Sequence, residues 1–145
     1  MIDETEKHFE GKIAQKVIVV RDEKVLLVQD PREGRDIWEL PGGRMNIDEE
    51  PRAAVAREFK EEMGVAIDVH EVVHMQQFIQ GSENARAFVI VYRATLTKPD
   101  EAFVLADEEV SHVGWFAKAE VAGLTLYPEY KSAVEAHFTG KYGDG

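Results

Sequence analysis

Three carboxylates, Glu58, Glu61 and Glu62, stand close together in a stretch with helical periodicity. Residues three and four apart share one face of a helix, and like charges there repel one another. A bound divalent cation would remove that repulsion, and Mg²⁺ and Mn²⁺ prefer oxygen ligands. Such ions polarise phosphoryl oxygens and generate hydroxide from water. The cluster therefore suggests metal-assisted hydrolysis of a phosphate compound.

An ordinary solvated helix face is the alternative, with Arg57 and Lys60 offsetting the negative charge. The helix by itself favours this alternative, because glutamate-rich helix surfaces are common. The preceding loop favours a site instead. Pro41–Gly43 lets the backbone approach a ligand closely, and its carbonyls could add a metal ligand. Glu49 lies two helical turns before Arg57, so that the two could pair and fix the loop to the helix.

The combined pattern resembles the Nudix box at every specified position. The matching residues are Gly43, Glu49, Arg57, Glu58, Phe59, Glu61, Glu62, Gly64 and Val65. The run Trp38–Gly42 is also similar to the usual approach to that box. One position departs from many relatives: this chain has Asp48 where they carry glycine, which concerns the shape of the loop.

The resemblance implies a fold and a chemistry. The expected fold is an α/β (α+β) sandwich of α/β/α layers with a mixed sheet, in which the box forms a loop–helix–loop. The family hydrolyses nucleoside diphosphates linked to another group, with Mg²⁺ or Mn²⁺ as cofactor. We expect one such domain over residues 1–145, with flexible ends at about 1–10 and 140–145.

The resemblance also implies roles for individual residues. Glu58, Glu61, Glu62 and the carbonyl of Gly42 would bind the metal. Glu58 and Glu61 would also act in catalysis, with Glu58 a candidate to orient or deprotonate the attacking water. Arg57 would pair with Glu49 and hold the carboxylates in place.

A second acidic group, Asp107-Glu108-Glu109, precedes a strand-like segment. Relatives often supply a further carboxylate from this region as metal ligand or general base. Glu109 is the first candidate for this catalytic role and Glu108 the second. A solvated turn is an equally good interpretation of the same residues.

Candidates for substrate binding lie near the box. They are chiefly Arg44, Arg35 and Trp38, with Arg32, Phe78, Tyr127, Gln76 and Gln77 behind them. The arginines could hold phosphates, and the aromatic rings could stack on a base. Taken singly, each is more often a surface charge or a core residue.

Alternating and periodic apolar residues predict the elements that position these groups. Val55, Phe59 and Met63 form the buried stripe of the central helix, which Asp48 would cap and Gly64 would end. We expect a hairpin of 16–20 and 25–29, strands at 37–40, 66–69, 72–75, 87–96 and 113–116, and helices at 118–123 and 128–138.

Composition and net charge argue against some classes of binding partner. The net charge of −11 argues against a nucleic-acid polymer, whose binding needs Lys and Arg contacts to phosphate. The chain has no cysteine, no apolar run long enough for a membrane and no secretory start. We therefore expect a cytoplasmic protein with a small nucleotide-type substrate, without a membrane partner, that could form a homodimer.

The leading hypothesis is a Mg²⁺-dependent pyrophosphohydrolase. Its substrate would be a nucleoside triphosphate, sugar nucleotide or dinucleotide. The alternative is a nucleotide-binding sensor module without turnover.

Overall fold

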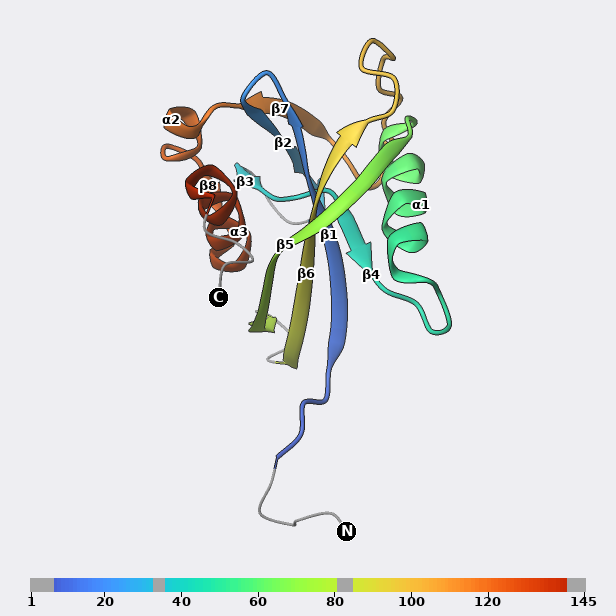
Figure 1. The fold of residues 1–145 in the computed structure, drawn as a ribbon, viewed down its shortest axis with the longest axis vertical. Coiled ribbons are helices and arrows are strands. Elements are labelled where there is room, and N and C mark those ends of the chain that lie inside the picture. The colour runs from blue at the N-terminus through green and yellow to red at the C-terminus, as the bar shows by residue number, and fades with distance from the viewer. Residues whose placement is uncertain (1–6, 33–35, 81–84, 141–145) are drawn as a thin grey trace.

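The computed structural model describes residues 7–32, 36–80 and 85–140. Figure 1 shows the elements in chain order, and their bounds are β1 Lys12–Arg21, β2 Lys24–Gln29, β3 Ile37–Trp38, β4 Gly42–Arg44, α1 Pro51–Met63, β5 Ile67–Gln80, β6 Ala85–Leu96, β7 His112–Phe116, α2 Lys118–Val121, β8 Thr125–Leu126 and α3 Pro128–Thr139.

Strand β1 organises a mixed sheet with the strand order β5-β6-β1-β2-β7. It pairs in parallel with β6 and antiparallel with β2, as the predicted hairpin requires. It also pairs antiparallel with β4, with Lys16 opposite Gly42. The glycine pair that the sequence suggested as a loop is therefore a short strand beside β1.

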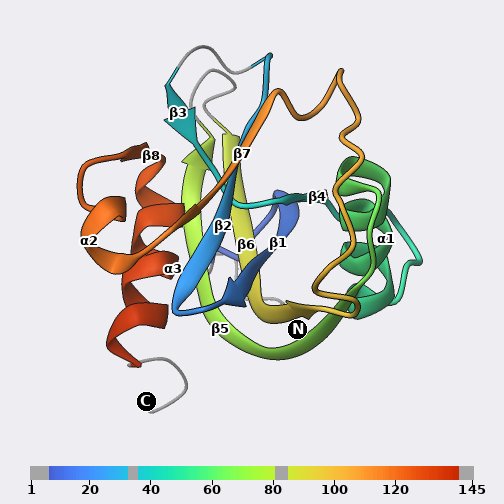
Figure 2. The same ribbon diagram turned by 90° about the horizontal axis from the view of Figure 1, so that it is seen from above.

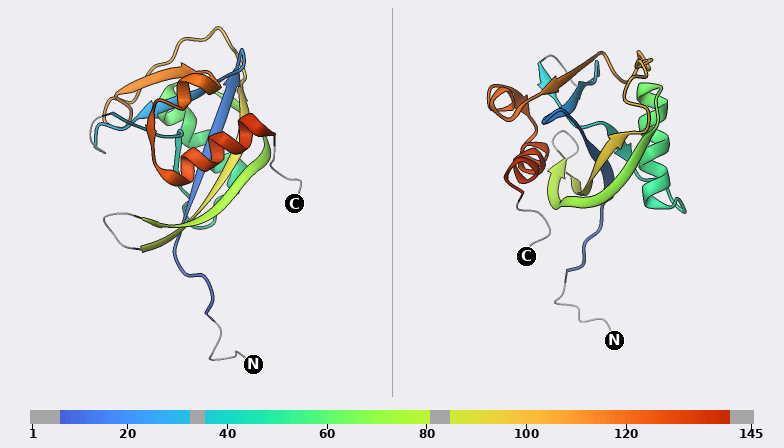
Figure 3. Two further views of the ribbon diagram at one scale, coloured as in Figure 1. Left: turned by 90° about the vertical axis from the view of Figure 1, so that its left-hand side faces the viewer. Right: turned by 45° about the horizontal axis from the view of Figure 1, so that its top comes forward.

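Helices cover both faces of this sheet, so that the molecule has three layers, α/β/α (Figure 2). Successive residues of a strand point to opposite faces. Val17 and Val19 of β1 pack in a core that includes Val55 and Phe59 of α1. Ile18 packs in the other core, with residues of α3. Figure 3 shows α1 and α3 on opposite sides of the sheet.

Helix α1 begins later than the sequence suggested. The prediction of Asp48 as cap is wrong: the cap is Glu50, whose carboxylate accepts a hydrogen bond from the Ala53 amide at 2.7 Å. Pro51 explains the shift, because a residue before proline favours extended backbone, and Glu50 has ψ 126°. The predicted end is confirmed, with Gly64 as C-cap at φ 76°.

The remaining elements follow the predictions with a few differences. The two strands expected at 66–69 and 72–75 are one strand, β5, with irregular pairing to β6 between Val69 and His74. Strand β8 was not anticipated; it pairs in parallel with β3. Of the ends expected to be flexible, residues 1–6 and 141–145 lie outside the described residues, and residues 7–10 have no regular secondary structure.

Candidate active site

Two of the three candidate carboxylates lie against the glycine strand β4. Glu62 Oε1 accepts a hydrogen bond from the Gly42 amide at 3.2 Å. Glu58 lies so close to Gly43 that a Cβ added there would be 1.9 Å from Glu58 Oε2. The four-residue spacing of Glu58 and Glu62 on α1 thus brings both carboxylates to the same short strand.

Gly42 is required by the backbone. Its φ of +132° is rarely adopted by residues with a side chain, and an added Cβ would lie 2.2 Å from the Gln15 carbonyl oxygen of β1. Gly43 has no such φ, and the three atoms nearest to its added Cβ all belong to the Glu58 side chain. The first glycine therefore serves the fold, and the second makes room for a carboxylate.

Arg57 ties the loop before the helix to the helix itself. Its guanidinium donates to Glu49 from Nη2, 2.8 Å from Oε2, and from Nε at 3.2 Å. The pairing inferred from sequence spacing is thus present in the structure. The same guanidinium donates to Glu61 Oε1 at 3.0 Å, and the Glu61 side chain is 60% exposed.

The predicted trio of carboxylates is therefore divided. Glu58 and Glu62 face the glycine strand, whereas Glu61 is paired with Arg57 at the surface. Among the described residues, no three acidic or histidine side chains lie close enough together to form a complete metal site.

Burial raises the pKa of both inward-facing carboxyls. The pKa of Glu62 rises to about 8, because desolvation and the nearby Glu109 and Glu58 outweigh the Lys16 ammonium and the Gly42 amide. The pKa of Glu58 rises to about 7, mainly through desolvation. Removing carboxylates from water without a cation disfavours their charged form. Both groups would hold a positive ion readily.

A buried carboxylate oxygen without a hydrogen-bond donor also indicates a site for a cation. Glu58 Oε1 is buried, and no described residue offers it a hydrogen bond. A buried oxygen of this kind is costly unless it is satisfied. The residues present thus fit a hard cation such as Mg²⁺: Glu58 and Glu62 with the Gly42 carbonyl beside them, and Glu61 one turn away.

The loop before β7 runs beside the end of α1 and carries the second acidic group. Its backbone is joined to the end of α1, since the Ala106 amide donates to the Glu62 carbonyl at 2.9 Å. A turn follows, and the negative charge of Glu109 raises the pKa of Glu62. This effect on Glu62 agrees with Glu109 as the first candidate for the added carboxylate.

A cleft of about 730 Å³ opens beside these groups. Its walls include Glu62, Gly42 and Gly43 on one side and residues of α3 on the other, and the full lining is Lys12, Ala14, Lys16, Asp30, Arg32, Glu39, Gly42, Gly43, Arg44, Glu62, Phe78, Gln80, Ala87, Tyr127, Glu129 and Tyr130. A space of this size suits a nucleotide-sized ligand.

The candidate substrate residues separate into those at the cleft and those away from it. Arg44, Arg32, Phe78 and Tyr127 line it. Trp38 does not; it packs edge-to-face on Phe116 at 4.9 Å between ring centroids. Arg35 lies outside the described residues, and Gln76 and Gln77 are not part of the lining.

Sequence reasoning missed Lys16. Its side chain is buried in the cleft, with Nζ 3.3 Å from the Gly42 carbonyl and 3.5 Å from Glu39 Oε1. The available signal was that Lys16 alternates with Ile18 and therefore shares its face of the strand.

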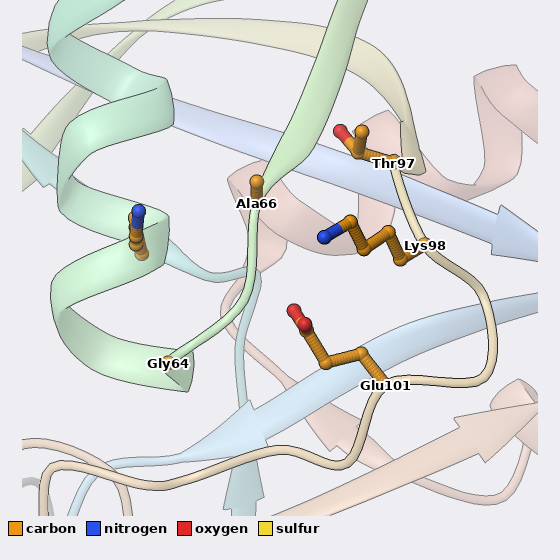
Figure 4. Close-up of a pocket in the computed structure, with 6 residues that line it drawn as sticks. Gly64, Ala66, Thr97, Lys98 and Glu101 are labelled. Carbon is orange, nitrogen blue, oxygen red and sulfur yellow. The ribbon is translucent and has the colours of Figure 1, made fainter.

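A second hollow, of about 250 Å³, lies beyond the C-terminal end of α1 (Figure 4). Lys60, Gly64, Ala66, Thr97, Lys98 and Glu101 line it, and none of the candidate site residues does. We therefore place the candidate site at the larger cleft.

Comparison with known proteins decides the family. The family model described as the NUDIX domain matches residues 12–137. The chain belongs to the Nudix family. A MutT-like protein of Streptomyces ambofaciens is 32% identical to this Nudix chain over 107 residues, 73% of this chain and 63% of the relative. The CTP pyrophosphohydrolase of Escherichia coli is 40% identical over 62 residues, 41% of this chain and 46% of the relative.

Solved structures agree on the fold. The MutT Nudix hydrolase of Burkholderia pseudomallei superimposes with a TM-score of 0.74 at 24% identity, covering 88% of this chain and 98% of that one. The predicted Nudix sandwich is thereby confirmed. The chain spans less than two thirds of the length of the two curated relatives named above.

Proposed function

We propose that this Nudix protein is a Mg²⁺- or Mn²⁺-dependent pyrophosphohydrolase. Its substrate would be a nucleoside diphosphate linked to a further group, as in a nucleoside triphosphate, sugar nucleotide or dinucleotide. The observation that carries the proposal is the pair of desolvated carboxylates, Glu58 and Glu62, held against the Gly42–Gly43 strand. Glu62 and both glycines line a nucleotide-sized cleft.

Glu58, Glu62 and the Gly42 carbonyl would hold the cation, with Glu61 as a further ligand released from Arg57. When bound, the cation neutralises phosphate charge and polarises the phosphorus–oxygen bonds. The Arg57–Glu49 pair holds the loop and so orients the glycine strand.

The chemistry needs a group that accepts a proton from water. Water attacks one phosphorus, the anhydride bond to the bridging oxygen breaks, and two phosphate products leave. A base works best when its pKa lies near the working pH. Acting as the base instead of as a metal ligand, Glu58, whose pKa is about 7 without a cation, is our first assignment, and Glu109, then Glu108, are the alternatives.

A Mg²⁺-dependent phosphate-release screen over nucleoside triphosphates, sugar nucleotides and dinucleotides tests the proposal. We expect turnover of at least one class and a loss of at least 100-fold in Glu62→Gln. Glu101→Gln is the matched control, because this exposed glutamate lies at the other hollow. Tight nucleotide binding without turnover would support a sensor module instead.

We further propose the cytoplasm as the compartment and a homodimer as the assembly. Strand β5 is an edge of the sheet, and its Met75 and Ile79 side chains are 59% and 49% exposed. Light scattering of the wild type and of Ile79→Glu measures the assembly, and a wild type of monomer mass contradicts it. No helix within the described residues is long and apolar enough to cross a membrane.

A further inference from the structure

Lys16 is the only buried cationic side chain among the described residues. It is 6% exposed and lies in β1, directly before three residues with no exposed surface, Val17–Val19. An ammonium ion removed from water costs several kcal/mol unless its partners compensate. A lysine at this position therefore needs an explanation beyond packing.

Despite desolvation, the charges of Tyr130, Glu39 and Glu62 raise the pKa of Lys16, yet its two measured oxygen contacts are long. The Gly42 carbonyl is 3.3 Å from Nζ, and Glu39 Oε1 is 3.5 Å away. Charge-assisted hydrogen bonds are normally about 2.7–2.9 Å long. The Tyr130 ring adds a cation–π contact at 5.4 Å to its centroid. A phosphate oxygen at about 2.8 Å would be a closer anionic partner than Glu39.

The position of Lys16 in the cleft indicates that this anionic partner is a substrate phosphate. Its side chain lines the same cleft as Glu62 and Gly42. The Gly42 carbonyl that it contacts is also the one proposed as a metal ligand. Two cations next to one carbonyl repel each other, and an anionic oxygen between them removes the repulsion. A phosphate oxygen bound there would meet both.

The other cations of the cleft are placed differently. Lys12, Arg32 and Arg44 are exposed, and Arg32 is engaged with Asp30, with Nη2 2.7 Å from Oδ2. Salt and water screen such groups more than a buried charge. The buried position makes Lys16 the strongest cation available to a phosphate in the cleft.

We propose that Lys16 binds the phosphoanhydride group of the substrate through its ammonium, between the carboxylate helix α1 and helix α3. The proposal rests on the proposed function and extends it to a residue outside the Nudix box. Glu39, Tyr130 and the Gly42 carbonyl position the ammonium, and the substrate phosphate is a further partner.

Binding of methylenediphosphonate, a pyrophosphate analogue that is not hydrolysed, tests the proposal in the presence of Mg²⁺. Titration calorimetry compares the wild type with Lys16→Met/Glu39→Gln, in which both charges of the pair are removed together. We expect binding to weaken about 10- to 100-fold, as for loss of a charged hydrogen bond. Lys24→Met, at an exposed lysine outside the cleft, should bind as the wild type does.

The same variants separate binding from stability. Replacing a buried ion pair with neutral groups is often neutral or stabilising, so the double variant should melt no lower than the wild type. In the wild type itself, the ammonium resonance of Lys16 should shift on addition of methylenediphosphonate, and that of Lys24 should not. This second measurement does not depend on the folding of any variant.

Unchanged affinity in a folded double variant, or an unmoved Lys16 resonance with saturating probe, would overturn the proposal. Its failure is distinguishable from failure of the proposed function. If no substrate turns over but the probe binds through Lys16, the hydrolase proposal fails and this one stands. If substrates turn over with an unchanged KM in the double variant, only the role of Lys16 is lost.

Discussion

Gly43→Ala is predicted to disable the site while sparing the fold. The added Cβ would lie 1.9 Å from Glu58 Oε2, whereas ordinary contact begins at 3.4 Å. The carboxylate must therefore withdraw by about 1.5 Å, since the backbone of Gly43 does not need a positive φ. A misplacement of about 1 Å in a catalytic group can cost roughly 100-fold in rate.

We therefore expect kcat of Gly43→Ala to fall about 100-fold in the Mg²⁺-dependent phosphate-release assay. Its melting temperature should change little, because a flexible side chain rather than backbone meets the new methyl group. Gly123→Ala is the matched control: its nearest atom would be 3.7 Å away, and its activity should be normal.

Gly42→Ala gives a contrasting expectation. Its Cβ would meet the β1 backbone at 2.2 Å, and its φ of +132° opposes any side chain. This variant should lose stability as well as activity. Full activity in Gly43→Ala would refute the reasoning, and so would a loss of stability as large as that of Gly42→Ala.

Three further predictions concern charge and backbone. The raised pKa values of Glu58 and Glu62 mean that the folded metal-free protein binds more protons than the unfolded chain between about pH 4.5 and 8. The melting temperature of the metal-free protein should therefore fall by several degrees from pH 6 to 8.5, since each pKa unit corresponds to about 1.4 kcal/mol of stability. Added Mg²⁺ should reverse the fall. A rise in melting temperature in calorimetry would contradict the raised pKa values of Glu58 and Glu62. Arg57→Ala should lower Mg²⁺ affinity or kcat about 10- to 100-fold with little change in melting, because exposed ion pairs contribute little stability, and unchanged calorimetry and kinetics would argue against a positioning role. Asp48→Gly should raise the free energy of unfolding in urea by up to about 1 kcal/mol, because Asp48 has φ 63°, and a decrease would show that the side chain stabilises the turn.

Local sequence was sufficient to predict the central helix, because the spacing of its apolar residues and its terminal glycine lie within one short segment. The four-residue spacing of Val55, Phe59 and Met63 predicts the face that is buried, and Gly64 predicts the end. The start was misplaced by two residues, since the restriction that Pro51 imposes on Glu50 is stronger than the capping preference of Asp48. Many relatives carry glycine at the position of Asp48. The positive φ of Asp48 explains this, because glycine adopts that conformation most easily.

Other features depend on contacts between distant parts of the chain. The glycine pair became strand β4 because β1 pairs with it. Spacing placed Glu58, Glu61 and Glu62 together, but the structure turned Glu61 toward Arg57 and the other two toward β4. No local pattern states which of several carboxylates on one helix face will be desolvated.

The sequence by itself determined the family, the carboxylate helix and the Glu49–Arg57 pairing, because helical spacing and the box residues are properties of a short segment. Only the tertiary structure decided which carboxyls are buried and that Lys16 lies in the cleft. The physical reason is desolvation: it depends on the packing of β1, β4, α1 and α3 around each group, and these elements meet only when the chain is folded.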